Sequence, residues 1–170
     1  MKEFSQIIRT AIKMETDGIE FYQKVADKTS HLFGKKMFLS FMKDEERHLS
    51  VLKRILAGLD FPDFEKYFGE TPGEKIKTVF NQIKDEIKER ITANPDEMEA
   101  LKLGMKMEEE SVRLYKGSLG KTTHPQAKAL LERLILEEED HYRILENVYL
   151  FLEDSGKWFL WEEKGLLNGG

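Results

Sequence analysis

The chain has 170 residues, no cysteine and a formal net charge of −5, from 27 Lys and Arg against 32 Asp and Glu. This length suits one domain, and the acidic balance gives no basic surface of the kind that holds nucleic acid. The absence of cysteine excludes disulfides, thiol catalysis and thiolate metal sites within the chain, so any metal must use histidine and carboxylate.

The first part of the chain predicts a helical hairpin. Apolar residues recur at helical spacing and no alternating strand pattern is sustained, so we expect an all-α protein. One helix is predicted over about residues 3–28 and a second over about residues 32–57, each with an apolar stripe along one face. The N-terminal segment is charged, and no stretch approaches the roughly 18 apolar residues that span a bilayer. We therefore expect a cytoplasmic protein without membrane contact.

The second part predicts a crossover helix and another hairpin. The stretch Thr71-Pro72-Gly73-Glu74 offers a capping threonine, a proline at the first helical position and a glutamate at the third. A crossover helix is therefore expected over about residues 72–92. Similar start signals predict two further helices, over about residues 95–119 and 125–154.

An internal repeat relates the two hairpins. When each residue is laid on the one 93 positions later, as His48 on His141, all four histidines pair off under one offset. A duplicated hairpin joined by a long crossover with an extra helix gives a ferritin-like four-helix bundle. We expect this bundle to occupy residues 1–155 and a short aromatic tail, residues 156–170, to pack on it. Ten residues match in all: Lys13, Met14, Glu15, Tyr22, Lys28, Thr29, His31, Glu45, His48 and Leu52 fall on Lys106, Met107, Glu108, Tyr115, Lys121, Thr122, His124, Glu138, His141 and Leu145.

Six titratable side chains fall on the predicted apolar stripes. At 100° per residue, the core face of each bundle helix carries an acid, and two of the helices add a histidine three residues later. These residues are Glu15, Glu45, His48, Glu108, Glu138 and His141. Their charged neighbours rotate off that face and are expected in solvent: Glu46, Glu109, Glu110, Glu139 and Asp140.

Four buried carboxylates need compensating charge. Without partners they would cost more than a typical stability margin of about 5–15 kcal/mol. No Lys or Arg shares these stripes, whereas two divalent cations would cancel four negative charges and use both imidazoles. One Glu from each of two helices, with Glu-x-x-His from each of the other two, is the ligand set of carboxylate-bridged di-iron or di-manganese bundles. Oxygen-rich ligation with two imidazoles suits iron or manganese better than zinc, although zinc could compete, so we predict a centre of two such metal ions.

This motif set resembles the rubrerythrin and bacterioferritin branch of the ferritin-like superfamily over about residues 3–154. The resemblance implies a role for each of the six residues. Glu45 and Glu138 would bridge the metals, Glu15 and Glu108 would be terminal ligands, and His48 and His141 would each bind one metal.

The sequence departs from the rubrerythrin pattern in two respects. Rubrerythrins typically have a second Glu one turn after the ligand on the third bundle helix, and Ser111 stands there in this chain. They also usually carry a rubredoxin domain, whose four thiolates this cysteine-free chain cannot supply. A site of six ligands, with electrons from elsewhere, is therefore expected.

Several polar residues near the stripes have two readings. Tyr22 and Tyr115 lie about 10 Å along the helix from Glu15 and Glu108, where each hydroxyl could reach a carboxylate of an antiparallel helix or simply pack in the core.

Asp44 and Glu137 precede the bridging acids. In relatives an acid there can orient a metal-bound histidine, but a surface charge is an equal alternative. His31 and His124 are expected to be exposed or capping, and Met14 and Met107 to pack.

The resemblance implies a non-haem di-iron oxidoreductase. It would reduce hydrogen peroxide or dioxygen, with electrons from a separate rubredoxin-like or flavin protein, and we expect a homodimer. Two alternatives use the same fold. The first is a ferroxidase that handles iron, and the second is a non-enzymatic helical module whose metals only stabilise the fold.

Overall fold

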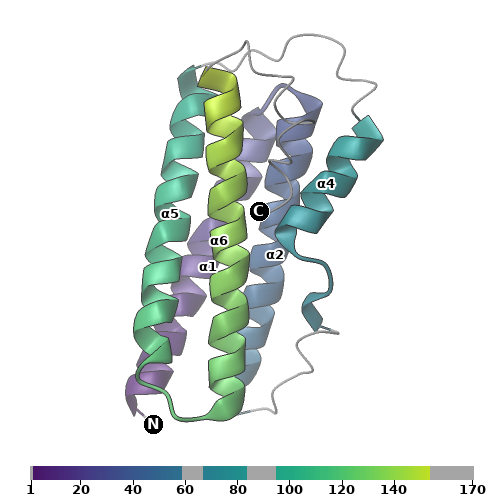
Figure 1. The fold of residues 1–170 in the computed structure, drawn as a ribbon. Helices are drawn as coiled ribbons and strands as arrows, with labels where there is room; N and C mark the ends of the chain where they lie inside the picture. Colours follow the sequence, from purple (N-terminus) through teal and green to yellow (C-terminus); the bar gives the residue numbers. More distant parts are fainter. Residues whose placement is uncertain (1, 59–66, 84–94, 154–170) are drawn as a thin grey trace.

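The computed structural model describes residues 2–58, 67–83 and 95–153, and no strand occurs in these ranges. The helices are α1 (Lys2–Lys28), α2 (Leu32–Leu56), α4 (Pro72–Ile83), α5 (Pro95–Leu119) and α6 (Pro125–Glu153) (Figure 1). Apart from the end of the crossover helix, their bounds agree with the predicted helices to within about two residues. The last part of the expected crossover helix and the aromatic tail lie outside the described residues. None of the described helices combines the length and the apolar character that crossing a membrane requires.

The four long helices form two antiparallel hairpins. In Figure 1, α1 and α6 run in one direction along the bundle, and α2 and α5 run in the other. Helix α1 packs along α2, α5 packs along α6, and α1 also contacts α5. Since α2 and α5 run the same way, the chain must return along the bundle between them, and α4 lies on this return against α2 and α6. The predicted ferritin-like layout with a long crossover is confirmed.

Local capping explains where two of the helices start. The Nδ1 atom of His31 accepts a hydrogen bond from the backbone N–H of Gly34 at 3.0 Å, so this histidine caps α2, as one of its predicted roles. A Cβ atom at Gly34 would lie 2.3 Å from the His31 ring, which explains the glycine. At the start of α4, the Glu74 carboxylate accepts from the backbone N–H of Thr71 at 2.8 Å, which completes the predicted capping box.

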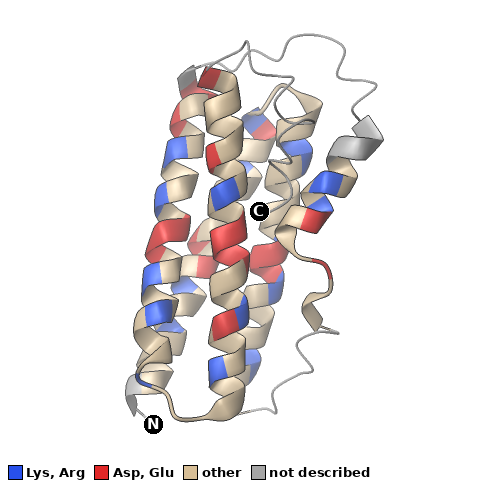
Figure 2. Ribbon diagram, in the orientation of Figure 1, with Lys and Arg blue, Asp and Glu red and all other residues tan. Residues whose placement is uncertain are grey.

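Within the described ranges, the core consists of two apolar clusters with a polar layer between them. One cluster includes Met37, Phe41 and Leu145, and the other includes Ile8 and Leu131. Side chains of α1, α2, α5 and α6 contribute to both clusters. A band of acidic residues crosses the bundle at mid-height (Figure 2). The functional side chains therefore lie in a layer that apolar packing shields from water on both sides.

Candidate metal centre

The six predicted ligands meet in one layer of the bundle core. Each of them is at most 4% exposed, and they come from four helices. They form two overlapping groups, in which one atom of each residue lies within 4.8 Å of one atom of every other member. The first group is Glu15, Glu45, His48 and Glu138, and the second is Glu45, Glu108, Glu138 and His141. The shared members, Glu45 and Glu138, are those to which the resemblance gives the bridging role.

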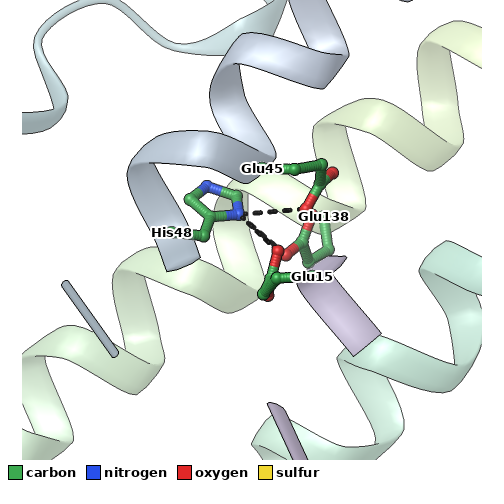
Figure 3. Close-up of side chains that lie close together, drawn as sticks. All are labelled: Glu15, Glu45, His48 and Glu138. Carbon is green, nitrogen blue, oxygen red and sulfur yellow. Dashed lines mark hydrogen bonds and ion pairs between the residues drawn. The ribbon is translucent and has the colours of Figure 1, made fainter. Parts of the chain in front are cut away.

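In the first group, the His48 ring points its Nδ1 atom at the acids. This atom lies 3.3 Å from Oε2 of Glu15, 3.2 Å from Oε1 of Glu138 and 3.4 Å from Oε2 of Glu45 (Figure 3). The acids come from α1, α6 and α2 respectively. Glu45 lies beside Gly18 of α1, where a Cβ would be in ordinary contact with Cγ of Glu45, at 3.5 Å.

The second group repeats this arrangement around His141. Its Nδ1 atom lies 3.1 Å from Oε2 of Glu138, 3.3 Å from Oε1 of Glu45 and 3.5 Å from Oε1 of Glu108. The ring also packs against Phe41, with the ring centroids 4.2 Å apart. The two imidazole rings are 6.3 Å apart, so both groups belong to one compact cluster.

Two further acids fix the orientation of the histidines. The Nε2 atom of His141 lies 3.2 Å from Oδ2 of Asp44, and Nε2 of His48 lies 3.1 Å from Oε2 of Glu137. Asp44 is 1% exposed and Glu137 is fully buried, so the surface-charge reading of these acids is wrong. With Nε2–H donating to an acid, the Nδ1 lone pair is directed into the cluster, where a metal could use it.

Sequence reasoning missed three cations behind these acids. Lys75 Nζ lies 2.6 Å from Oδ1 of Asp44, and an Arg47 nitrogen lies 2.5 Å from the same oxygen. Arg133 contacts Oε1 of Glu137 at 2.7 Å. The two arginine contacts could have been predicted from the sequence, because Arg47 and Arg133 lie three and four residues from their acids on the same helix. The Lys75 contact could not, because its partner Asp44 lies 31 residues away in the sequence.

Each of the two core tyrosines donates a hydrogen bond to an acid of the other hairpin. The Tyr22 hydroxyl donates to Oε1 of Glu108, and the Tyr115 hydroxyl donates to Oε1 of Glu15. Each tyrosine thus reaches the acid of the other hairpin, and both rings are 1% exposed. Burial and the neighbouring Glu108 raise the pKa of Tyr22 well above its usual value, and burial with Glu15 does the same for the pKa of Tyr115. Both hydroxyls therefore stay protonated donors.

Replacing Tyr115 with phenylalanine should destabilise the protein by about 1–3 kcal/mol, because a buried oxygen of Glu15 loses its donor. Differential scanning calorimetry checks this as a fall in Tm of roughly 2–12 °C. The matched control is Tyr149→Phe, since the Tyr149 hydroxyl donates to Glu153 at 3.1 Å on the surface. Its Tm should stay close to that of the unmodified protein. Equal losses in the two variants would contradict a special role for the buried pair.

Two acids and both histidines of the cluster have raised pKa values. Burial, with the Glu45 carboxylate beside it, raises the pKa of Glu15 to about 8. Burial and Glu138 raise the pKa of Glu108 to about 7. Burial alone would lower the pKa of His48, but the carboxylates of Glu138 and Glu15 outweigh it and raise that pKa well above its ordinary value. Without metal, the cluster must therefore hold protons to balance its charge.

The donor set fits two divalent cations. Oε1 of Glu45 and Oε1 of Glu138 are buried without a hydrogen bond from any described residue, although each lies near a histidine Nδ1. Oxygen donors supplemented by two imidazoles suit iron or manganese better than structural zinc. No Lys or Arg of the described residues forms an ion pair with the four cluster acids. Protons or metal ions are thus the available counter-charges.

The other candidates of the sequence lie outside both groups. His124 is exposed directly before α6, and Met14 and Met107 are partly buried. Ser111 is 9% exposed, at the position where rubrerythrins typically have their further Glu. The six-ligand site stays a prediction, in which Ser111 supplies no carboxylate.

Four helices with one Glu or one Glu-x-x-His each, all directed inward, define a carboxylate and histidine cluster protein of the ferritin-like superfamily. The family model described as Rubrerythrin matches residues 6–149 of the chain. The protein therefore belongs to the rubrerythrin family. Neither the curated proteins nor the solved structures contain a match to the chain.

Proposed function

We propose that this protein is a non-haem di-iron oxidoreductase that reduces hydrogen peroxide or dioxygen. The observation that carries the proposal is the pair of buried ligand groups sharing Glu45 and Glu138, in a chain of the rubrerythrin family. Glu15 and His48 would complete one metal position, and Glu108 and His141 the other. Two bound irons would supply two electrons, which suffice to reduce one hydrogen peroxide to two waters or one dioxygen to hydrogen peroxide.

The chain's own residues would hold and shield this centre. Asp44 and Glu137 hold the imidazole rings through Nε2, so that Nδ1 of each ring faces the cluster. Tyr22 and Tyr115 fix the carboxylates of the terminal acids. The apolar clusters on both sides exclude water, which strengthens these electrostatic contacts and blocks side reactions.

The electrons would come from a separate donor, such as a rubredoxin-like or flavin protein. None of the 170 residues is a cysteine that could hold a rubredoxin-type iron. Reduction of hydrogen peroxide takes two electrons and two protons and yields two molecules of water. The donor would have to return two electrons for each peroxide consumed.

Stopped-flow mixing tests the proposal. Protein loaded with iron and reduced anaerobically should be reoxidised by hydrogen peroxide or by dioxygen, with two irons oxidised per peroxide consumed. Zinc-loaded protein is the matched control, because zinc can occupy the same ligands without redox chemistry. Iron-loaded protein that reacts with neither oxidant would contradict an oxidoreductase and leave the metals a structural role. Oxidation of added Fe²⁺ in large excess, with retention of the product, would instead favour the ferroxidase alternative.

A further inference from the structure

Helix α4 lies outside the four-helix bundle but is fastened to it close to the metal centre. It packs against α2 and α6 (Figure 1). The side chain of its Ile76 is fully buried. The backbone N–H of Gly73 donates to Oδ2 of Asp140 on α6 at 3.2 Å. A Cβ at Gly73 would lie 3.2 Å from that same oxygen and 3.3 Å from Arg143, so a larger residue would crowd this contact. The first turn of α4 is therefore held close to the bundle surface.

Lys75 extends this attachment into the polar layer. Its Nζ atom lies 2.6 Å from Oδ1 of Asp44, whose other oxygen, Oδ2, lies 3.2 Å from Nε2 of His141. The side chain of Lys75 is 20% exposed and that of Asp44 is 1% exposed. Solvent screens an ion pair in this setting less than an exposed pair. A change in this pair should therefore affect the side chains that Asp44 contacts more strongly.

The two histidines differ in which helices supply the cations that pair with their acid partners. Glu137, which holds His48, is paired with Arg133 from its own helix and with Arg47 at 3.4 Å. Asp44, which holds His141, is paired with Arg47 at 2.5 Å and with Lys75 from the crossover helix. Among the described residues, Lys75 is thus the cation that reaches a histidine-bound acid from outside the four long helices.

We propose that Lys75 is a positioning residue for His141, so that the crossover helix supports one of the two metal positions and not the other. Lys75 holds Oδ1 of Asp44 and so directs Oδ2 toward Nε2 of His141, whose ring then presents Nδ1 to Glu45, Glu108 and Glu138. The inference rests on the proposed metal centre and adds to it a functional difference between its halves.

The first experiment examines the metal-free protein by NMR of ¹⁵N-labelled histidine. In Lys75→Met, which removes the charge while keeping similar length, the Nε2–H signal of His141 should shift and exchange faster with water. The His48 signals should stay in place, because His48 is held by Glu137 and not by Asp44. Lys75→Arg, which keeps the charge, should restore the His141 signal. Unchanged His141 signals in Lys75→Met would overturn the inference, whatever metal the protein binds.

The second experiment measures Co²⁺ affinity by competition with a chelator. Changes of partners behind a metal ligand typically cost about 10–100-fold in affinity. Because Arg47 stays on Asp44, we expect a loss of about tenfold for one of two bound Co²⁺ ions in Lys75→Met, with recovery in Lys75→Arg. The control is Lys116→Met, since Lys116 forms an exposed pair with Glu139, also at 2.6 Å. This variant should bind both ions as the unmodified protein does.

The outcomes separate the inference from the metal centre itself. If the unmodified protein binds two Co²⁺ ions and Lys75→Met binds both equally well, the positioning role is wrong while the centre stands. If both ions are lost together in Lys75→Met, the selective effect is also contradicted. If the unmodified protein binds no Co²⁺, the proposed centre is overturned and the inference with it.

Discussion

Replacing Glu45 with alanine should remove both metals and abolish peroxide-dependent reoxidation. Glu45 and Glu138 belong to both ligand groups, so the loss of either carboxylate affects both positions. Mutation of a residue that only hydrogen-bonds to a metal ligand typically lowers metal affinity about 10–100-fold. Loss of a ligand shared by both metals should therefore lower it at least about 100-fold. Metal content by elemental analysis and reoxidation by stopped-flow should fall together.

Two sets of controls make this prediction specific. Glu46 and Glu139 follow the shared acids directly in the sequence but are exposed, so their alanine variants should keep metal and activity. Glu15 and Glu108 each belong to one group, so their alanine variants should lose mainly one metal. Equal damage from Glu45→Ala and Glu46→Ala would contradict the assignment of the core face.

The metal-free protein should lose stability as the pH rises from about 6 to about 9. Glu15 and Glu108 have pKa values raised to about 8 and about 7 from an ordinary 4.5, so the folded state keeps protons that the unfolded state has released. The pKa values of His48 and His141 are raised as well, which extends the effect above pH 6.5. Unfolding then releases protons, and stability falls with rising pH.

The size of this effect follows from the shifts. Each unit of pKa shift corresponds to about 1.4 kcal/mol, and each kcal/mol moves Tm by about 2–4 °C, so a fall on the order of 10 °C is expected. Asp44 and Glu137 act in the opposite sense, because hydrogen bonds from the histidines overcome burial and keep the pKa of each acid low. Their stabilisation is lost only in acid, as the pH falls below about 4.5.

Bound metal should counteract the loss of stability that the metal-free protein shows as the pH rises. Divalent cations displace the protons of the cluster, so the Tm difference between metal-loaded and metal-free protein should grow with pH. Thermal melts of both forms across this range provide the measurement. The variant Glu15→Gln mimics the protonated acid and should flatten the metal-free curve, whereas Glu46→Gln should not. A metal-free Tm that rises between about pH 6 and about pH 9 would contradict the account.

The sequence predicted most of the fold because helical periodicity, caps and the internal repeat all point to the same arrangement. The start of α4 followed from Thr71 and Glu74, whose side chains form the expected contacts. The repeat predicted that two similar hairpins would pair, and the exchange of partners by Tyr22 and Tyr115 matches that symmetry. These signals are local or repeated, so a single sequence contains them.

The layer behind the histidines was harder to predict. Periodicity places Asp44 and Glu137 near the edge of the core face, where burial depends on what covers the helix. Segments far away in the sequence provide that cover: Phe68 packs near His48, with centroids 5.7 Å apart, and Lys75 pairs with Asp44. Such contacts depend on how the crossover docks, which no periodic pattern encodes.

Anomalous diffraction from crystals grown with iron is the most direct test of the central claim, a paired metal centre in the bundle core. Two iron peaks are expected per chain, both contacting Glu45 and Glu138. One should also contact Glu15 and His48, and the other Glu108 and His141. The contradicting result would be a core without iron peaks, with these carboxylates paired to protein donors or turned outward.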